Sequence, residues 1–256
     1  MITCKSEREI RYMARAGEIV ALAHQAAKAA IRPGLSTLEL DKICEDVILA
    51  NDATPSFKGL YGFPNACCIS VNNVLVHGIP SSDIILKDGD IVSVDIGACY
   101  HGYHGDSAWS YAVGSISEEA KKLMEVTEQS LYEGLKMAKA GNRLTDISHA
   151  IETYVYQNGF SIPQDYAGHG IGSQVHEDPT VPNFGKPGKG VRLKEGMCLA
   201  IEPMVHAGKP QTRVLNDEWT VVTKDGSLAA HFEHSVVIRK DGCEILTTIH
   251  DKEESQ

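Results

Sequence analysis

Several acidic residues lie where the surrounding sequence predicts buried β-strands, and several histidines lie in segments rich in glycine and proline. A lone strand aspartate usually does no more than end the strand in a turn. A buried carboxylate without a partner is costly, however, so a whole set of them requires an explanation. Carboxylates that bridge two cations, completed by an imidazole, form the ligand set of a two-metal site. The acids are Asp95, Asp106, Glu202 and Glu233, and the histidines are His77, His169 and His176.

Two of the acids flank a predicted hairpin. The segment YHGYHG at 100–105 predicts a turn between two strands. If the hairpin is antiparallel and centred between Tyr100 and His101, Asp95 and Asp106 face each other directly. Like charges so placed destabilise a sheet, because their Cβ atoms are only about 5 Å apart. The pair therefore requires a cation, or one carboxylate must hold a proton.

Other histidines give weaker indications of chemistry. His231 shares a strand face with Glu233, and His234 points to the opposite face; we interpret both histidines as structural. His101 and His104 lie in the predicted turn, where we expect them to be solvated.

The elements that must position these residues alternate between helices and short strands. Between the second helix and the first strand, residues 54–66 form a loop rich in glycine, proline and aromatic residues. Hydrophobic periodicity and helix-end signals predict the boundaries. Helices are expected at about 6–31, 37–51, 117–140 and 145–158, and strands at 67–72, 91–98, 107–113, 197–205, 219–223 and 231–239.

The two halves of the chain repeat each other. LKDG at 86–89 and LKEG at 193–196 each precede an apolar strand, and each has an acid nine residues after its leucine. Upstream, VHGI at 76–79 parallels GHGI at 168–171. In both halves a glycine also stands just before the second helix. We infer a duplicated α/β unit whose copies each bring a histidine and a strand carboxylate to a shared centre.

Composition limits the class of protein. A chain of 256 residues with 43% hydrophobic and 23% charged residues is typical of an ordinary globular protein. The net charge of −10 disfavours a general nucleic-acid binder, and no apolar run reaches the ~20 residues of a membrane span. Seven cysteines without a CxxC pair indicate reduced thiols in a cytoplasmic protein. We expect one catalytic domain over 1–256, with internal pseudo-repeats at about 32–113 and 140–239.

Five ordered motifs, which together span nearly the whole chain, resemble the methionine aminopeptidases. They are VHGIP at 76–80, DIG…GYHGDSA at 95–108, GHGIG…VHEDP at 168–179, IEPM at 201–204 and FEHSVVI at 232–238. The fold that this resemblance implies is the α/β "pita-bread" fold. In it, two pseudo-twofold-related halves build an antiparallel sheet, backed by helices, around a dinuclear metal site.

The resemblance also implies a role for each site residue. The two-metal ligands are Asp95, Asp106, His169, Glu202 and Glu233, of which Asp106 and Glu233 bridge the ions. His77 and His176 contact the substrate, and Glu202 also carries a proton. The implied cofactors are two divalent ions per chain, chosen from Co, Mn, Fe(II) and Zn. The implied methionine pocket is lined by Phe57, Leu60, Tyr61, Phe63, Cys68, Tyr166, Val175 and Trp219, although plain core packing is an alternative for each.

The implied activity is removal of an N-terminal methionine when the second residue is small, by attack of a metal-activated water on the first peptide bond. Only 31 positions separate Glu202 from Glu233, so the long insertion of the type II enzymes has no room. The first helix follows closely on Met1, which leaves no zinc-finger extension. We therefore expect a bacterial type I enzyme that acts as a monomer on the N-terminal peptide of nascent proteins. Transient contact with the ribosome is compatible with this role, whereas no DNA or membrane partner is implied.

Two alternatives remain at this point. An Xaa-Pro metallopeptidase of the same fold would share the five ligands, but it usually carries a separate N-terminal domain. A non-catalytic binding relative would lack some of the ligands, and here all of them are present. Activity on a short peptide panel separates the three readings.

Overall fold

The computed structural model describes residues 1–249. Its helices are α1 (Glu7–Ala30), α2 (Thr37–Ala50), α3 (Glu118–Met137) and α4 (Leu144–Gln157), with a short 3-10 turn at Leu60–Gly62. The strands of the first half are β1 (Thr54–Pro55), β2 (Cys67–Val71), β3 (Val74–Val76), β4 (Ile91–Tyr100) and β5 (Tyr103–Ala112). Those of the second half are β6 (Ala167–Gly170), β7 (Glu177–Pro182), β8 (Cys198–Ile201), β9 (Met204–His206), β10 (Thr212–Val214), β11 (Val221–Thr223), β12 (Ala229–His231), β13 (His234–Ile238) and β14 (Cys243–Ile245).

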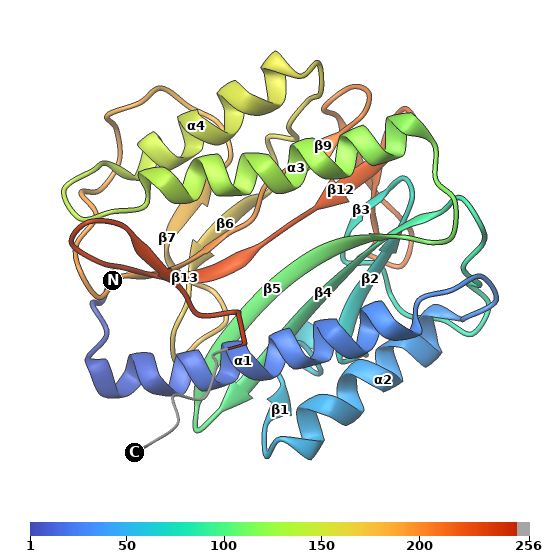
Figure 1. Ribbon diagram of the computed structural model, residues 1–256, viewed down its shortest axis with the longest axis horizontal. Helices are drawn as coiled ribbons and strands as arrows, with labels where there is room; N and C mark the ends of the chain where they lie inside the picture. The colour runs from blue at the N-terminus through green and yellow to red at the C-terminus, as the bar shows by residue number, and fades with distance from the viewer. Residues whose placement is uncertain (250–256) are drawn as a thin grey trace.

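The helices form two outer layers around the strands. In Figure 1, α1 and α2 cover the sheets on one side and α3 and α4 cover them on the other. The first-half sheet is built on the β4–β5 hairpin with β2 and β1, and the second-half sheet has the order β14-β13-β8-β6-β7. All pairings in the described residues are antiparallel. The expected antiparallel sheets backed by helices are therefore confirmed.

Each half has its own hydrophobic core. In the first half, apolar residues of α1 and α2, including Ile19 and Leu40, pack against β4 residues such as Val94. In the second half, Leu131 of α3 and Ile151 of α4 pack in a separate cluster with the strands of that sheet. No helix among residues 1–249 is both long and apolar enough to cross a membrane.

The repeated sequences form the same local structure twice. Gly34 donates its N–H to the carbonyl of Leu86 at 2.8 Å, and Gly141 donates to the carbonyl of Leu193 at 3.0 Å. Both glycines have a positive φ, 91° and 95°, which favours glycine over other residues. These bonds attach the loop before the second helix to the loop before the acid-bearing strand. The strand carboxylate of each half is thereby set at an equivalent place.

The hairpin register differs from the expected one. The turn is His101-Gly102, both with positive φ, as a tight two-residue hairpin turn requires. The ladder therefore pairs Gly97 with Asp106 and leaves Asp95 opposite Ala108. The two aspartates are diagonal neighbours on one face, and the prediction that they are directly opposed is wrong. His104 belongs to β5 rather than to the turn, and its Nδ1 lies 2.8 Å from the hydroxyl of Ser56.

Two expected strands are interrupted at an acid. The strand predicted at 197–205 breaks into β8 and β9 at Glu202-Pro203, where proline offers no N–H to the ladder. The strand predicted at 231–239 breaks into β12 and β13 at Phe232-Glu233. Phe232 donates its N–H to the carbonyl of Pro203 at 3.3 Å, so the two breaks lie side by side. Both glutamates thus sit at interruptions of the sheet.

Candidate metal centre and active site

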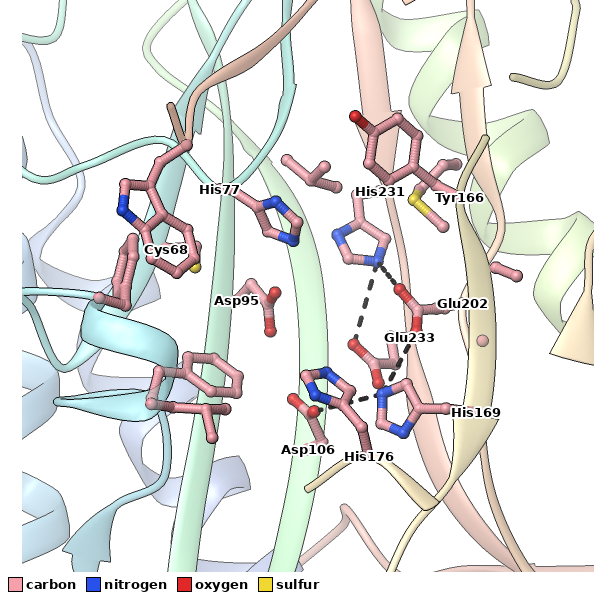
Figure 2. A pocket seen from close by; sticks show the side chains of 18 of the residues that line it. Cys68, His77, Asp95, Asp106, Tyr166, His169, His176, Glu202, His231 and Glu233 are labelled. Atoms are coloured by element: carbon pink, nitrogen blue, oxygen red, sulfur yellow. Dashed lines mark ion pairs between the residues drawn. The ribbon is translucent and has the colours of Figure 1, made fainter. Parts of the chain in front are cut away.

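Side chains from both halves converge on one point between the sheets. Figure 2 shows the carboxylates of Asp95, Asp106, Glu202 and Glu233 directed toward a common centre, with His169 beside them. Nε2 of His169 lies 3.5 Å from Oε1 of Glu202 and 3.8 Å from Oδ2 of Asp106. The fold thus brings together all five residues that the resemblance singled out as ligands.

His231 joins this cluster, which sequence reasoning missed. Its Nε2 lies 3.3 Å from Oε2 of Glu202 and 3.9 Å from Oε2 of Glu233. The interpretation of His231 as a structural residue did not predict this position beside the acids. A signal was present, since His231 and Glu233 were expected on one strand face. The proximity of Glu202 comes from the paired strand breaks, which the sequence pattern did not predict.

Burial dominates the electrostatics of the carboxylates. Desolvation raises the pKa of Asp95 and of Glu202 to about 7. It also raises the pKa of Asp106, where the nearby charges of Asp95 and Glu202 add to the effect. Desolvation likewise raises the pKa of Glu233, and the charge of Asp106 raises it further. Four carboxylates that oppose one another's ionisation are suited to a site where cations supply the missing positive charge.

The histidines of the cluster supply no such charge. Burial lowers the pKa of both His169 and His231, so these imidazoles are neutral near pH 7. A neutral imidazole is the form that binds a metal ion. Nδ1 of His169 lies 2.9 Å from the carbonyl of Gly170, a contact that orients the ring and leaves Nε2 directed at the acids.

The polar atoms of the site fit divalent metal ions. Of the buried side-chain atoms in residues 1–249 that have no hydrogen-bond partner, four belong to this site: Oδ1 of Asp95, Oδ1 of Asp106, Oε1 of Glu233 and Nε2 of His231. Such atoms are rare in folded proteins and require an explanation, which bound cations would supply for the four at this site. Two sets of ligand atoms lie within 4.8 Å of one another: Asp106, His169 and Glu233, and Glu202, His231 and Glu233. Glu233 belongs to both sets, as a bridging ligand would.

Glycines on both sides of His169 allow its strand to fit. A Cβ on Gly168 would lie 2.3 Å from the carbonyl oxygen of Ala200, and one on Gly170 would lie 2.1 Å from that of Asp178. Any side chain at these positions would push β6 away from its neighbours. The Gly-His-Gly sequence is therefore what lets the imidazole reach the acids.

His77 and His176 lie at the rim of the cluster (Figure 2). His77 has a φ of 59°, and its ring packs edge-on against Tyr166 and Trp219 at centroid distances of 6.2 and 6.4 Å. His176 packs against the ring of His169 at 4.5 Å. Burial lowers the pKa of His77 to about 4 and also lowers that of His176. Both rings are therefore neutral and can donate a hydrogen bond from one nitrogen.

An apolar cavity of about 420 Å³ opens onto the acids. Seven of the eight residues expected in the methionine pocket line it, and so do Val76 and Met204, which were not expected. Val175 is the exception: it does not line the cavity, although it packs in one buried cluster with Phe57, Phe63 and Cys68, which do. The seven residues that line the cavity are Phe57, Leu60, Tyr61, Phe63, Cys68, Tyr166 and Trp219.

Comparison with known proteins agrees with this geometry. The profile of metallopeptidase family M24 matches residues 11–240, and the chain belongs to that family. Methionine aminopeptidase 1 of Bacillus subtilis is 57% identical over 97% of this chain and 100% of its own length. The crystal structure of methionine aminopeptidase from Thermotoga maritima superposes with a TM-score of 0.96 at 46% identity, covering 97% of this chain and all of that one.

Within family M24 the chain groups with the methionine aminopeptidases. The Escherichia coli methionine aminopeptidase is 42% identical, and the match covers 98% of this chain and 95% of that protein. By contrast, the prolidase from Pyrococcus furiosus is 25% identical, with a TM-score of 0.78, and this chain covers 66% of it. The resemblance to the methionine aminopeptidases, the pita-bread fold and the assignment as a metal-dependent exopeptidase are confirmed, and the Xaa-Pro alternative is not supported.

Proposed function

We propose that this protein removes the N-terminal methionine from nascent proteins whose second residue is small. One observation carries the proposal: the apolar cavity and the buried acids form a single space. A methionine side chain in that cavity would place the first peptide bond at the carboxylates. The names of relatives that are 55–57% identical support the same activity.

We propose that two divalent ions are held by the five residues of the resemblance. Asp106 and Glu233 would be the bridging ligands, and Asp95, His169 and Glu202 would complete the set. When bound, such ions supply a Lewis acid and a nucleophilic water at neutral pH. The oxygen-rich donor set accepts Mn, Fe(II), Co or Zn, so availability rather than geometry selects among them.

The remaining polar residues act on the substrate. His176 is the donor to the oxygen of the scissile carbonyl, which becomes negative during the attack. His77, from the opposite half, contacts the nitrogen of the same bond and orients it. Glu202 carries the proton from the attacking water to the departing amine.

The pocket selects methionine by shape and polarizability. Phe63 and Trp219 pack edge to face at a centroid distance of 5.1 Å, and Cys68 lies in the same cluster. A flexible thioether makes favourable contacts with aromatic ring edges. The wall therefore matches methionine better than a branched or charged side chain.

A peptide panel tests this function. The purified, metal-supplemented protein should cleave Met-Ala-Ser and should leave Met-Leu-Ser largely intact. A chelator should abolish cleavage, and Mn, Fe(II) or Co should restore it. Equal turnover of the two peptides would contradict the selectivity, and a preference for Xaa-Pro would contradict the activity itself.

We also propose that residues 1–256 form one catalytic domain, of which 250–256 lie outside the described residues. The support is that both halves contribute residues to a single cavity. We propose that this domain works as a monomer in the cytoplasm, where nascent N-termini emerge, with transient ribosome contact. Sedimentation of the protein alone and with ribosomes tests both points. A stable dimer, or no co-sedimentation, would contradict them.

A further inference from the structure

One wall of the cavity is a loop with little regular structure. This pocket loop, residues 57–66, carries Phe57, Leu60, Tyr61 and Phe63 into the lining. Its backbone closes on itself, since Gly59 and Phe63 are joined by an N–H to carbonyl bond of 2.8 Å. Such internal bonds set the form of the loop. They do not set where the loop stands relative to the rest of the cavity.

Helix α2 holds the pocket loop from behind. Asp41 is 4% exposed, and both of its carboxylate oxygens accept hydrogen bonds at the end of the loop. The side-chain amide of Asn65 donates to one oxygen at 2.8 Å, and the backbone N–H of Cys67 donates to the other at 2.8 Å. One helical turn further along, Glu45 pairs with Lys58 of the loop at 2.7 Å.

Asp41 itself is not among the residues that line the cavity. A buried carboxylate is costly, and here the cost is offset by bonds that all go to the loop and the strand that follows it. The next residue, Cys68, lines the cavity. The carboxylate of Asp41 thus contacts the chain where the pocket loop ends and β2 begins, on the side away from the cavity.

We propose that Asp41 is a positioning residue for methionine recognition, which it serves by fixing the pocket loop to helix α2. This inference rests on the proposed function. The reacting groups lie on other elements, around β4, β5, β6 and the two strand breaks. Loss of the Asp41 contacts should therefore loosen the methionine pocket while leaving the metal centre and the substrate-contacting histidines in place.

The test compares Asp41→Ala with Lys42→Ala. Lys42 lies on the same helix but pairs with Asp46 at the surface, away from the loop, so it is a matched control. For Asp41→Ala we expect KM for Met-Ala-Ser to rise roughly tenfold, because a displacement of about 1 Å in a binding wall has effects of this order or larger. We expect kcat to change less than about threefold, and the preference for Met-Ala-Ser over Leu-Ala-Ser to fall about fivefold.

A second readout does not depend on turnover. Binding of free methionine, followed by the fluorescence of Trp219 in the pocket, should weaken about tenfold in Asp41→Ala and be unchanged in Lys42→Ala. Metal content by elemental analysis should be equal in both variants. If Asp41→Ala does not fold, Asn65→Ala removes one of the two bonds and should shift KM and methionine binding in the same direction.

The outcomes separate the two claims. A lower melting temperature with unchanged KM, selectivity and methionine binding would show that Asp41 only stabilises the fold, and would overturn the inference. A fall in kcat alone, or a loss of metal, would overturn it as well. If the wild-type protein binds methionine but does not cleave Met-Ala-Ser, the proposed function fails while the Asp41 inference is still decided by the binding measurement.

Discussion

Nε2 of His231 lies 3.3 Å from Oε2 of Glu202, although the two residues lie at two separate interruptions of the sheets. His231 ends β12, and Glu202 follows the last residue of β8. The contact places a neutral imidazole against a carboxylate whose pKa burial raises to about 7. It ties the proton carrier of the proposed mechanism to a residue outside the five ligands.

Replacing His231 should weaken metal binding. A group that orients a metal-binding carboxylate typically contributes 10–100-fold to metal affinity or activity, so we expect His231→Ala to lose about that much. His231→Gln keeps a donor and should lose less. Calorimetric titration with Mn measures the effect, with His101→Ala in the exposed turn as the control. If His231→Ala bound Mn with wild-type affinity, His231 would have only a structural role.

Replacing either proposed bridging acid should affect both ions together. In Asp106→Ala or Glu233→Ala, each ion loses an oxygen ligand, so both binding steps should weaken. The surface variant Asp241→Ala should bind as the wild type does. Calorimetry resolves the two steps. One normal site beside one lost site would show that the altered residue serves a single ion.

His77 and His176 should matter for turnover and not for metal content. Loss of one hydrogen-bond donor to a developing oxyanion typically lowers kcat by about 10²–10³, and we expect this for His176→Ala. His77→Ala should also turn over poorly at saturating substrate. Elemental analysis should find the same metal content as in the wild type. A variant with normal kcat would remove that histidine from the mechanism, and one that had lost metal would make it a ligand.

The metal-free protein should become less stable as pH rises above neutrality. The buried acids have a raised pKa, about 7 for Asp95 and Glu202. Their contribution to the free energy of unfolding is therefore complete below pH 4 and is lost as pH rises through 7. His24 and His234 have a pKa lowered to about 4, so they make the protein more stable as pH rises. Their effect ends at about pH 6.5, the pKa of an unfolded histidine. Between pH 6.5 and 8.5 we expect Tm to fall by roughly 5–10 °C.

Thermal melts after chelation measure this effect. With saturating Mn the trend should reverse, because metal ions bind the deprotonated carboxylates more strongly as pH rises. A Tm that stayed constant or rose across this range without metal would contradict the assignment of a raised pKa to these four acids.

Adding one methyl group beside His169 should disrupt the centre. In Gly168→Ala the new Cβ would meet the carbonyl of Ala200 at 2.3 Å, so β6 must move and carry the imidazole with it. We expect a loss of roughly 1–3 kcal/mol in stability and weaker metal binding. Gly242→Ala is the control, because its Cβ would meet nothing within 4 Å. Unfolding in urea and metal titration measure the two effects. Equal behaviour of the two variants would refute the steric argument.

The sequence by itself determined the four helices and the duplication, and its motifs singled out the five residues proposed as metal ligands. Helix periodicity and end signals are local, and they placed the helices within a few residues of their observed bounds. The duplication was readable because the two copies keep the same short motifs in the same order. Acids inside apolar segments stood out because burial of a charge is costly wherever the segment lies.

Only the tertiary structure decided the register of the hairpin, the two strand breaks and the place of His231. A shift of the turn to His101-Gly102 makes Asp95 and Asp106 diagonal rather than opposed, and such a shift changes no local hydrophobic pattern. The contact of His231 with Glu202 depends on where two separate strands are interrupted side by side. That Val175 does not line the cavity was likewise decided by the packing of segments that are distant in sequence. The relative positions of distant segments are set by how they pack together, and the hydrophobic periodicity of one segment does not predict that packing.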